Sequence, residues 1–116
     1  MKKPFAVPVL LSQMRVTDPF FAARMDVIRT HMLPYQWDAL NDRLPGTEPS
    51  HSIENFRIAA GLSDGAYHGM VFADSDLYKW LEAVAFALAA DPGYALRAHA
   101  EEAIGSWKRR SFPTGI

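Results

Sequence analysis

Two aspartates stand two positions apart in GMVFADSDLYKWLEA, residues 69–83, where an apolar run meets a helical pattern. Carboxylates at such a junction can cap a helix, bind a cation or accept hydrogen bonds from a ligand. The order Asp74-Ser75-Asp76 is similar to the opening of a calcium loop, but Lys79 stands where that loop needs a glycine, so we exclude calcium. We expect at least one of these three residues to cap the following helix, which leaves the other aspartate for a ligand.

The histidines offer a second kind of chemistry. His31, His51, His68 and His99 include no pair spaced for metal binding on one helix and no H-E-x-x-H sequence. His31 and His99 fit ordinary surface or half-buried positions. His51 and His68 are more interesting, because both stand beside loops at predicted helix ends, where functional sites concentrate.

Glu54 and Glu82 are the candidate carboxylate pair for an independent hydrolase. Each stands beside apolar positions at helical spacing and fits a surface position equally well, and their separation would decide the stereochemical outcome. The chain has no cysteine, which excludes a disulfide, a cysteine-based zinc site and a cysteine nucleophile within it.

Composition sets the class of protein. The 116 residues are 49% hydrophobic and 22% charged, with a formal net charge of −1, which is typical of one soluble domain with a small core. This balance excludes nucleic acid or an anionic membrane as an expected partner. We find no signal peptide and no charge-free stretch long enough to span a bilayer, so we expect a cytoplasmic protein.

The residues that could do chemistry must be positioned by helices. We expect an extended arm over residues 1–17 with a short strand near Gln13–Thr17, helices over 18–107, and a frayed tail over 108–116. The first helix starts at Thr17 or Asp18, and Pro34 interrupts it and begins a second helix that closes at Pro45-Gly46.

Three further helices follow. One begins with Ser50 or Ser52 as its cap and ends at Gly61, a loop covers 61–75, and helices follow over 76–90 and 92–107. Asp91 is the expected cap of the last helix. Apolar residues at helical spacing predict the inner faces, namely Phe21, Met25, Ile28 and Met32, then Ile53 and Phe56, then Leu77, Trp80, Leu81, Val84 and Leu88, then Leu96, Ala100, Ala103 and Trp107.

Three blocks of this sequence resemble the N-terminal part of glycoside hydrolase family 127 proteins, the β-L-arabinofuranosidase-like enzymes. They are LPYQWDALNDRLPG, PSHSIENFRIAAG and HGMVFADSDLYKWLEAVAFAL, and the lead-in SQMRVTDPFF is also similar. The resemblance covers residues 12–92 in order. It implies an (α/α)₆ barrel followed by β-sandwich domains, and retaining hydrolysis of terminal β-L-arabinofuranose. It also implies a zinc-bound cysteine thiolate as nucleophile, a glutamate as general acid/base, and zinc held by further cysteines and a glutamate.

The chain departs from that family pattern, because without cysteine no family nucleophile or zinc ligand can be carried over. We therefore expect a single truncated domain over 1–116, an all-α, incomplete (α/α)₆-barrel-like array without a cofactor of its own and inactive alone. The stripes on 76–90 and 92–107 would leave an open apolar flank for self-association or for the missing part. A small helical interaction module without catalytic role is the alternative.

By their position in the matched blocks, five residues are the expected contributors to a sugar pocket: Ser50, His51, Phe72, Asp74 and Asp76. Asp and His side chains there would hydrogen-bond sugar hydroxyls, and Phe72 would supply an apolar ring face. The alternative is that His51 and the two aspartates only fasten loops to helix ends.

Overall fold

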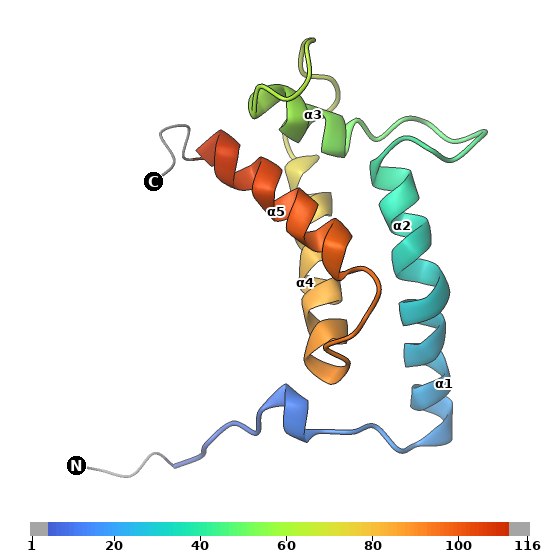
Figure 1. Ribbon diagram of the computed structural model, residues 1–116. Coiled ribbons are helices and arrows are strands. Elements are labelled where there is room, and N and C mark those ends of the chain that lie inside the picture. The colour runs from blue at the N-terminus through green and yellow to red at the C-terminus, as the bar shows by residue number, and fades with distance from the viewer. Residues whose placement is uncertain (1–4, 112–116) are drawn as a thin grey trace.

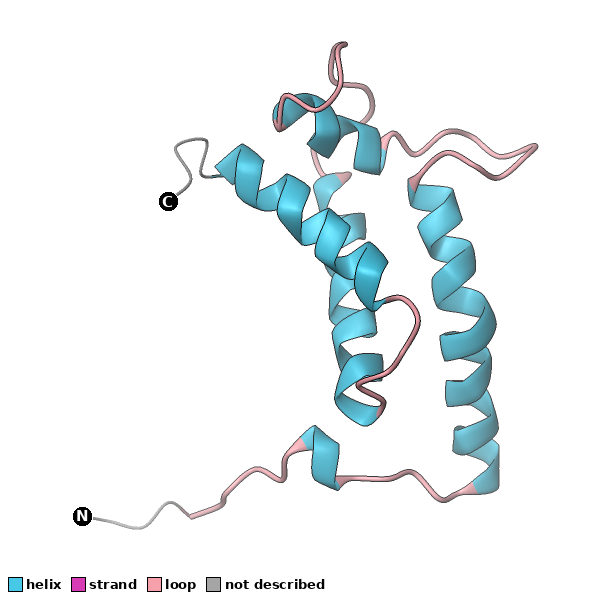
Figure 2. Cartoon of the chain, in the orientation of Figure 1, coloured by secondary structure: helices cyan, strands magenta, loops and turns pink. Residues whose placement is uncertain are grey.

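Helices, turns and loops account for the described chain, and no strand occurs in residues 5–111, the part that the computed structural model describes (Figure 2). The expected all-α class is confirmed. In chain order the elements are the 3₁₀ turn η1 (Leu11–Gln13), α1 (Pro19–Val27), the π-helical segment η2 (Ile28–Met32), α2 (Leu33–Leu40), α3 (Ser52–Ala59), α4 (Asp74–Ala90) and α5 (Arg97–Ser111).

The N-terminal arm is extended, as expected, but the predicted short strand near Gln13–Thr17 is wrong. The arm forms η1 and then runs without regular structure into α1, and η1 contacts α4. A strand needs a neighbouring strand to pair its main-chain groups, and none lies beside the arm in the described chain (Figure 1).

The segments α1, η2 and α2 form one continuous rod (Figure 1). Asp18 caps the rod as predicted, because its Oδ1 accepts a hydrogen bond from the Phe21 main-chain N at 3.0 Å. Pro34 stands in the first turn of α2, as predicted, but it does not interrupt the rod. Proline lacks the N–H of a normal helical turn, and the chain accommodates it by widening to a π turn, in which the Leu33 N–H bonds to the Ile28 carbonyl.

The rod ends earlier than the sequence predicts, at Leu40 rather than near Pro45. Asn41 follows, and its side-chain Nδ2 donates to the Trp37 carbonyl at 2.9 Å. Asp42 then takes a left-handed conformation with φ of 59°, which a helix cannot continue through.

The core lies between α2, α3, α4 and α5. The predicted inner faces of α3 and of the last two helices are confirmed at most positions, while Leu81, Leu88 and Trp107 are partly buried against that core. Four further core residues lie outside the predicted inner faces, namely Leu33, Trp37, Leu40 and Tyr94. The buried hydrophobic residues are Leu33, Trp37, Leu40, Ile53, Phe56, Leu77, Trp80, Val84, Tyr94, Leu96, Ala100 and Ala103.

The open apolar surface is not where the sequence predicts it. The stripes on α4 and α5 pack within the chain, whereas the apolar face of α1 and η2 stays exposed, with Phe21, Met25, Ile28 and Met32 all solvent-accessible. The helical spacing of apolar residues in the sequence identifies the apolar face of a helix. Whether that face is buried depends on what lies against it.

The ends of α4 and α5 also differ from expectation. Ala73 occupies the cap position of α4 and has no side-chain acceptor, so the predicted cap by Asp74, Ser75 or Asp76 is not formed at that position, although both acids stand in the first turn. Asp91 ends α4 instead of capping α5, and its Oδ1 accepts from the Gly93 N at 3.1 Å. Helix α5 runs on to Ser111, through the first part of the expected tail, and residues 112–116 lie outside the described chain.

Candidate functional site

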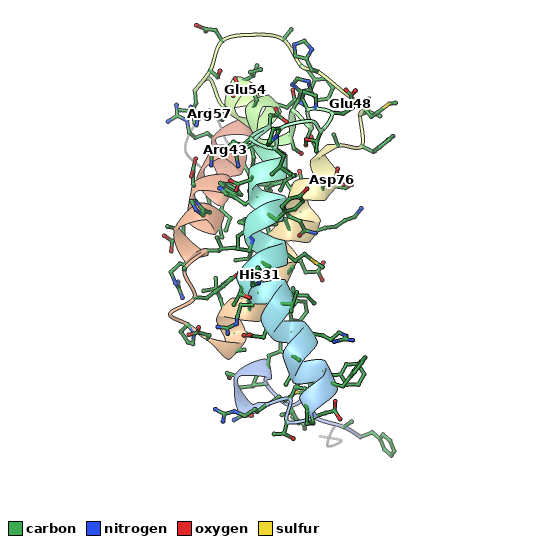
Figure 3. All side chains as sticks on the ribbon, turned by 90° about the vertical axis from the view of Figure 1, so that its right-hand side faces the viewer. His31, Arg43, Glu48, Glu54, Arg57 and Asp76 are labelled. Carbon is green, nitrogen blue, oxygen red and sulfur yellow. The ribbon has the colours of Figure 1, made fainter. Side chains whose placement is uncertain are left out.

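The five expected sugar-pocket residues and His68 lie on segments that meet at one end of the helical array. There α2 ends, α3 lies across the layer and α4 begins, at the end remote from the N-terminal arm (Figure 1). Figure 3 shows Glu54 and Asp76 at this end, whereas His31 lies part-way along the rod. Chain segments far apart in sequence therefore meet where the loops are.

His51 occupies the cap position of α3, in a left-handed conformation with φ of 56°. Its main-chain N donates to the Asp42 carboxylate, at 3.0 Å to Oδ1 and 3.2 Å to Oδ2, and its ring Nδ1 lies 3.8 Å from Asp42 Oδ2. Asp42 is itself left-handed, so two residues in a disfavoured conformation are joined to each other.

The predicted serine cap of α3 is wrong, because His51 takes that position. Ser50 Oγ accepts from the Ser52 N at 3.3 Å just outside the helix. Ser52 is buried, and its Oγ donates to the Ala73 carbonyl at 3.1 Å. That bond ties the start of α3 to the residue before α4, and so brings Ser50 and His51 beside the segment that carries Phe72 and Asp74.

His68 joins this site through its main chain and its ring. Asn55, only 6% exposed, donates from Nδ2 to the His68 carbonyl at 2.7 Å and accepts from the His68 N at 3.1 Å. The rings of His51 and His68 then lie with centroids 5.0 Å apart and planes inclined by 33°. The sequence pattern singles out His68 but not Asn55 or Asp42. Asn55 stands one helical turn after His51, and this spacing is the local feature that relates the two residues.

The remaining predicted site residues lie at the start of α4 and on the loop before it. Phe72 is 67% exposed beside Met70 and Val71, which are also exposed. Asp76 is exposed and lies 3.9 Å from the Lys79 Nζ, one turn along the helix. Asp74 is half-buried in the first turn of α4. The positive end of the helix favours both carboxylates there.

Glu54 and Glu82 have no arrangement that indicates an acid–base pair. Ser63 donates a hydrogen bond to Glu54, and Arg57 lies 3.7 Å from it on the same helix. Glu82 is exposed on α4. The Glu54 carboxylate is therefore engaged within α3 and its following loop.

At the opposite end lies a cavity of about 480 Å³ between the arm, the rod and α4. Its walls are largely apolar and include Met25, Phe86 and Ala87. Arg29, which also lines it, lies 2.7 Å from Asp26 and 3.5 Å from Asp91. The hydrogen bond with Asp26 is the main cause that raises the pKa of Arg29.

The zinc centre implied by the family resemblance does not fit the residues present. The sequence has no cysteine, and among residues 5–111 no group of three or more histidines and carboxylates is arranged to hold a metal ion. No step of chemistry is therefore derived through zinc on this chain.

Comparison with known proteins decides the family. A family model described as "Beta-L-arabinofuranosidase, GH127 catalytic domain" matches residues 13–110. The chain belongs to glycoside hydrolase family 127. The resemblance seen in the three sequence blocks is thereby confirmed, and the GH127 match extends beyond them into α5.

Two relatives place the GH127 chain against longer proteins. It is 43% identical over 95 residues to a non-reducing end β-L-arabinofuranosidase of Bifidobacterium longum subsp. longum. This alignment covers 72% of this chain and 14% of that protein. The crystal structure of a GH127 β-L-arabinofuranosidase from Geobacillus stearothermophilus T6 matches with a TM-score of 0.79 and 52% identity, over 83% of this chain and 15% of that one. The chain therefore spans about a seventh of these relatives.

Within residues 5–111, no helix combines the length and the apolar character needed to cross a membrane.

Proposed function

We propose that this chain forms the N-terminal part of a β-L-arabinofuranosidase-type catalytic domain, whose complete form hydrolyses terminal β-L-arabinofuranosides with retention. The GH127 match over residues 13–110 carries this proposal. The two relatives support it, since both are β-L-arabinofuranosidases and both share at least 43% identity with the chain. The expected cytoplasmic location stays a prediction.

The chain's own contribution to the reaction would be binding. In this proposal Ser50, His51, Asp74 and Asp76 hydrogen-bond sugar hydroxyls, and the exposed ring of Phe72 covers an apolar face of the sugar. Their common position at the loop end of the layer supports this, as does the Ser52–Ala73 hydrogen bond that joins their two segments. None of these residues is assigned a bond-breaking role.

The nucleophile of the complete enzyme would come from outside these 116 residues. A cysteine thiolate cannot be supplied here, because the sequence contains no cysteine. We therefore expect the chain alone to release no product from an aryl β-L-arabinofuranoside. Hydrolysis by the purified chain that persists without zinc would contradict this proposal.

The exposed apolar surface around the cavity would receive the rest of the domain. Met25 and Ile28 line the cavity and are exposed, and Phe86 on α4 is 54% exposed beside them. Such a contiguous apolar surface is costly in water and marks an interaction site. The same observation favours a second candidate function, an interaction module that uses this surface to associate with a copy of itself.

The test mixes this chain with the part of the Geobacillus relative that follows the matched segment. We expect the mixture to hydrolyse an aryl β-L-arabinofuranoside when neither part does so alone. Met25→Glu should abolish this gain, because it places a charge in the apolar cavity. Val27→Glu changes an exposed residue of the same helix that does not line the cavity, and should not. A stable complex without turnover would contradict the proposed activity, and a self-associating chain that binds no complement would favour the interaction module.

A further inference from the structure

His51 and His68 are brought together by interactions that use their main chains and not their rings. Asp42 holds the His51 N, and Asn55 holds both the N and the carbonyl of His68. Asn55 is buried and both of its hydrogen bonds reach across thirteen residues. These bonds fix the two main-chain segments relative to each other, and the two rings then lie with centroids 5.0 Å apart.

The rings face solvent at the loop end. His68 is exposed and its ring has no hydrogen bond within residues 5–111, while the His51 side chain is 37% exposed, with Asp42 Oδ2 at 3.8 Å from Nδ1 as its charged neighbour. His51 also keeps a left-handed backbone, with φ of 56°, which is disfavoured for a residue other than glycine. Residues held in a disfavoured backbone conformation cluster at active sites and ligand-binding sites.

We propose that His68 joins His51 in a two-imidazole site that hydrogen-bonds two neighbouring hydroxyls of a furanoside. The identity of the ligand rests on the proposed function, whereas the pairing of the rings rests on the structure alone. Each neutral imidazole carries one donor and one acceptor, which suits a hydroxyl. Rings 5.0 Å apart address two points of one small ligand, and His68 thereby becomes a sugar-binding residue that the family blocks alone did not identify.

The test follows the ring carbon-bound protons of all four histidines by NMR while methyl β-L-arabinofuranoside is added to the full chain. We expect the His51 and His68 signals to shift together and to saturate with one dissociation constant, and the His31 and His99 signals to stay unchanged. Tetrahydrofurfuryl alcohol, which has a similar ring but a single hydroxyl, should give no saturable shift. Absence of a saturable shift with the furanoside, or equal shifts at all four histidines, would overturn the proposal.

Substitutions then test whether the His68 imidazole itself, and not the loop around it, contributes to furanoside binding. His68→Ala should weaken furanoside binding about five-fold, the loss expected for one hydrogen bond, and His68→Gln should restore part of it. The matched control His31→Ala removes an exposed imidazole part-way along the rod and should change nothing. An unchanged dissociation constant for His68→Ala would overturn the proposal.

The two proposals fail differently. If the mixture with the Geobacillus part is active and His68→Ala leaves its KM unchanged, the imidazole site is wrong and the proposed function stands. If the furanoside binds at His51 and His68 but the mixture shows no turnover, the proposed function is wrong and the binding site stands.

Discussion

Trp37 and Trp80 lie against each other in the core, with ring centroids 4.7 Å apart, but only Trp80 has a hydrogen-bond partner for its indole N–H. The Trp80 Nε1 donates to the Leu33 carbonyl at 3.0 Å, which links α4 to the rod. The Trp37 Nε1 is buried and has no acceptor in the described chain. Two indoles in one cluster therefore differ in a single polar contact.

This difference predicts that tryptophan-to-phenylalanine substitution lowers the free energy of unfolding by different amounts at the two positions. Trp80→Phe removes a buried hydrogen bond to the Leu33 carbonyl, whereas Trp37→Phe removes a donor that has no partner in the described chain. We expect the free energy of unfolding to fall by about 1–2 kcal/mol more for Trp80→Phe. Urea unfolding followed by circular dichroism measures both. An equal or larger loss for Trp37→Phe would show that the bond to Leu33 contributes nothing.

Asn55 is predicted to hold the loop that follows α3. Asn55→Ala removes both hydrogen bonds to the His68 main chain, and we expect it to lower the free energy of unfolding by about 1–3 kcal/mol. Amide hydrogen exchange should accelerate in the loop of residues 60–73 before it does in α4. Ser63→Ala, which removes a side-chain bond to Glu54 in the same loop, is the control and should leave the exchange of His68 unchanged.

The left-handed backbone of His51 predicts that glycine at this position gives a more stable protein than alanine, the reverse of the order inside a helix. His51→Gly should be more stable than His51→Ala by about 1 kcal/mol, because alanine cannot take this φ without strain. At His99, inside α5, the order should reverse, since glycine weakens a helix by about 1 kcal/mol relative to alanine. Thermal unfolding of the four variants measures this. The same order at both positions would contradict the conformation of His51.

Tyr94 predicts a loss of stability at alkaline pH. Burial raises the pKa of Tyr94, and the nearby Arg29 charge lowers it in part. The folded chain holds the phenol proton more tightly than the unfolded chain, so this contribution is complete below the unfolded pKa of about 10 and is lost as pH rises through the folded pKa. Tyr94→Phe should therefore flatten the fall in unfolding free energy above about pH 10. Tyr35→Phe, which removes an exposed phenol, is the control. A fall as steep in Tyr94→Phe as in the control would contradict this assignment.

Sequence predicts the fold of this chain best where short-range patterns decide it. Asp18 with Pro19 marks the start of α1, and the spacing of Leu77, Trp80 and Val84 identifies the buried face of α4. Both are local features, because a cap needs only the next turn and a helical face repeats every three or four residues.

Features that depend on distant residues are not predictable in this way. The continuity of the rod through Pro34 requires a π turn whose formation no local preference indicates. The contact of His51 with His68 requires the Asn55 bonds and the left-handed Asp42, and none of these has a sequence signature as clear as a cap. The apolar face of α1 was recognised, but its exposure reflects what packs beside it and not its own period.

The central claim is that residues 13–110 are equivalent to the matching N-terminal segment of a GH127 β-L-arabinofuranosidase. The most direct test replaces that segment of the Geobacillus stearothermophilus enzyme with residues 13–110 of this chain and measures hydrolysis of an aryl β-L-arabinofuranoside. We predict a folded chimera with kcat/KM within about ten-fold of the parent enzyme, a difference of about 1.4 kcal/mol. A folded chimera without arabinofuranosidase activity would contradict the account.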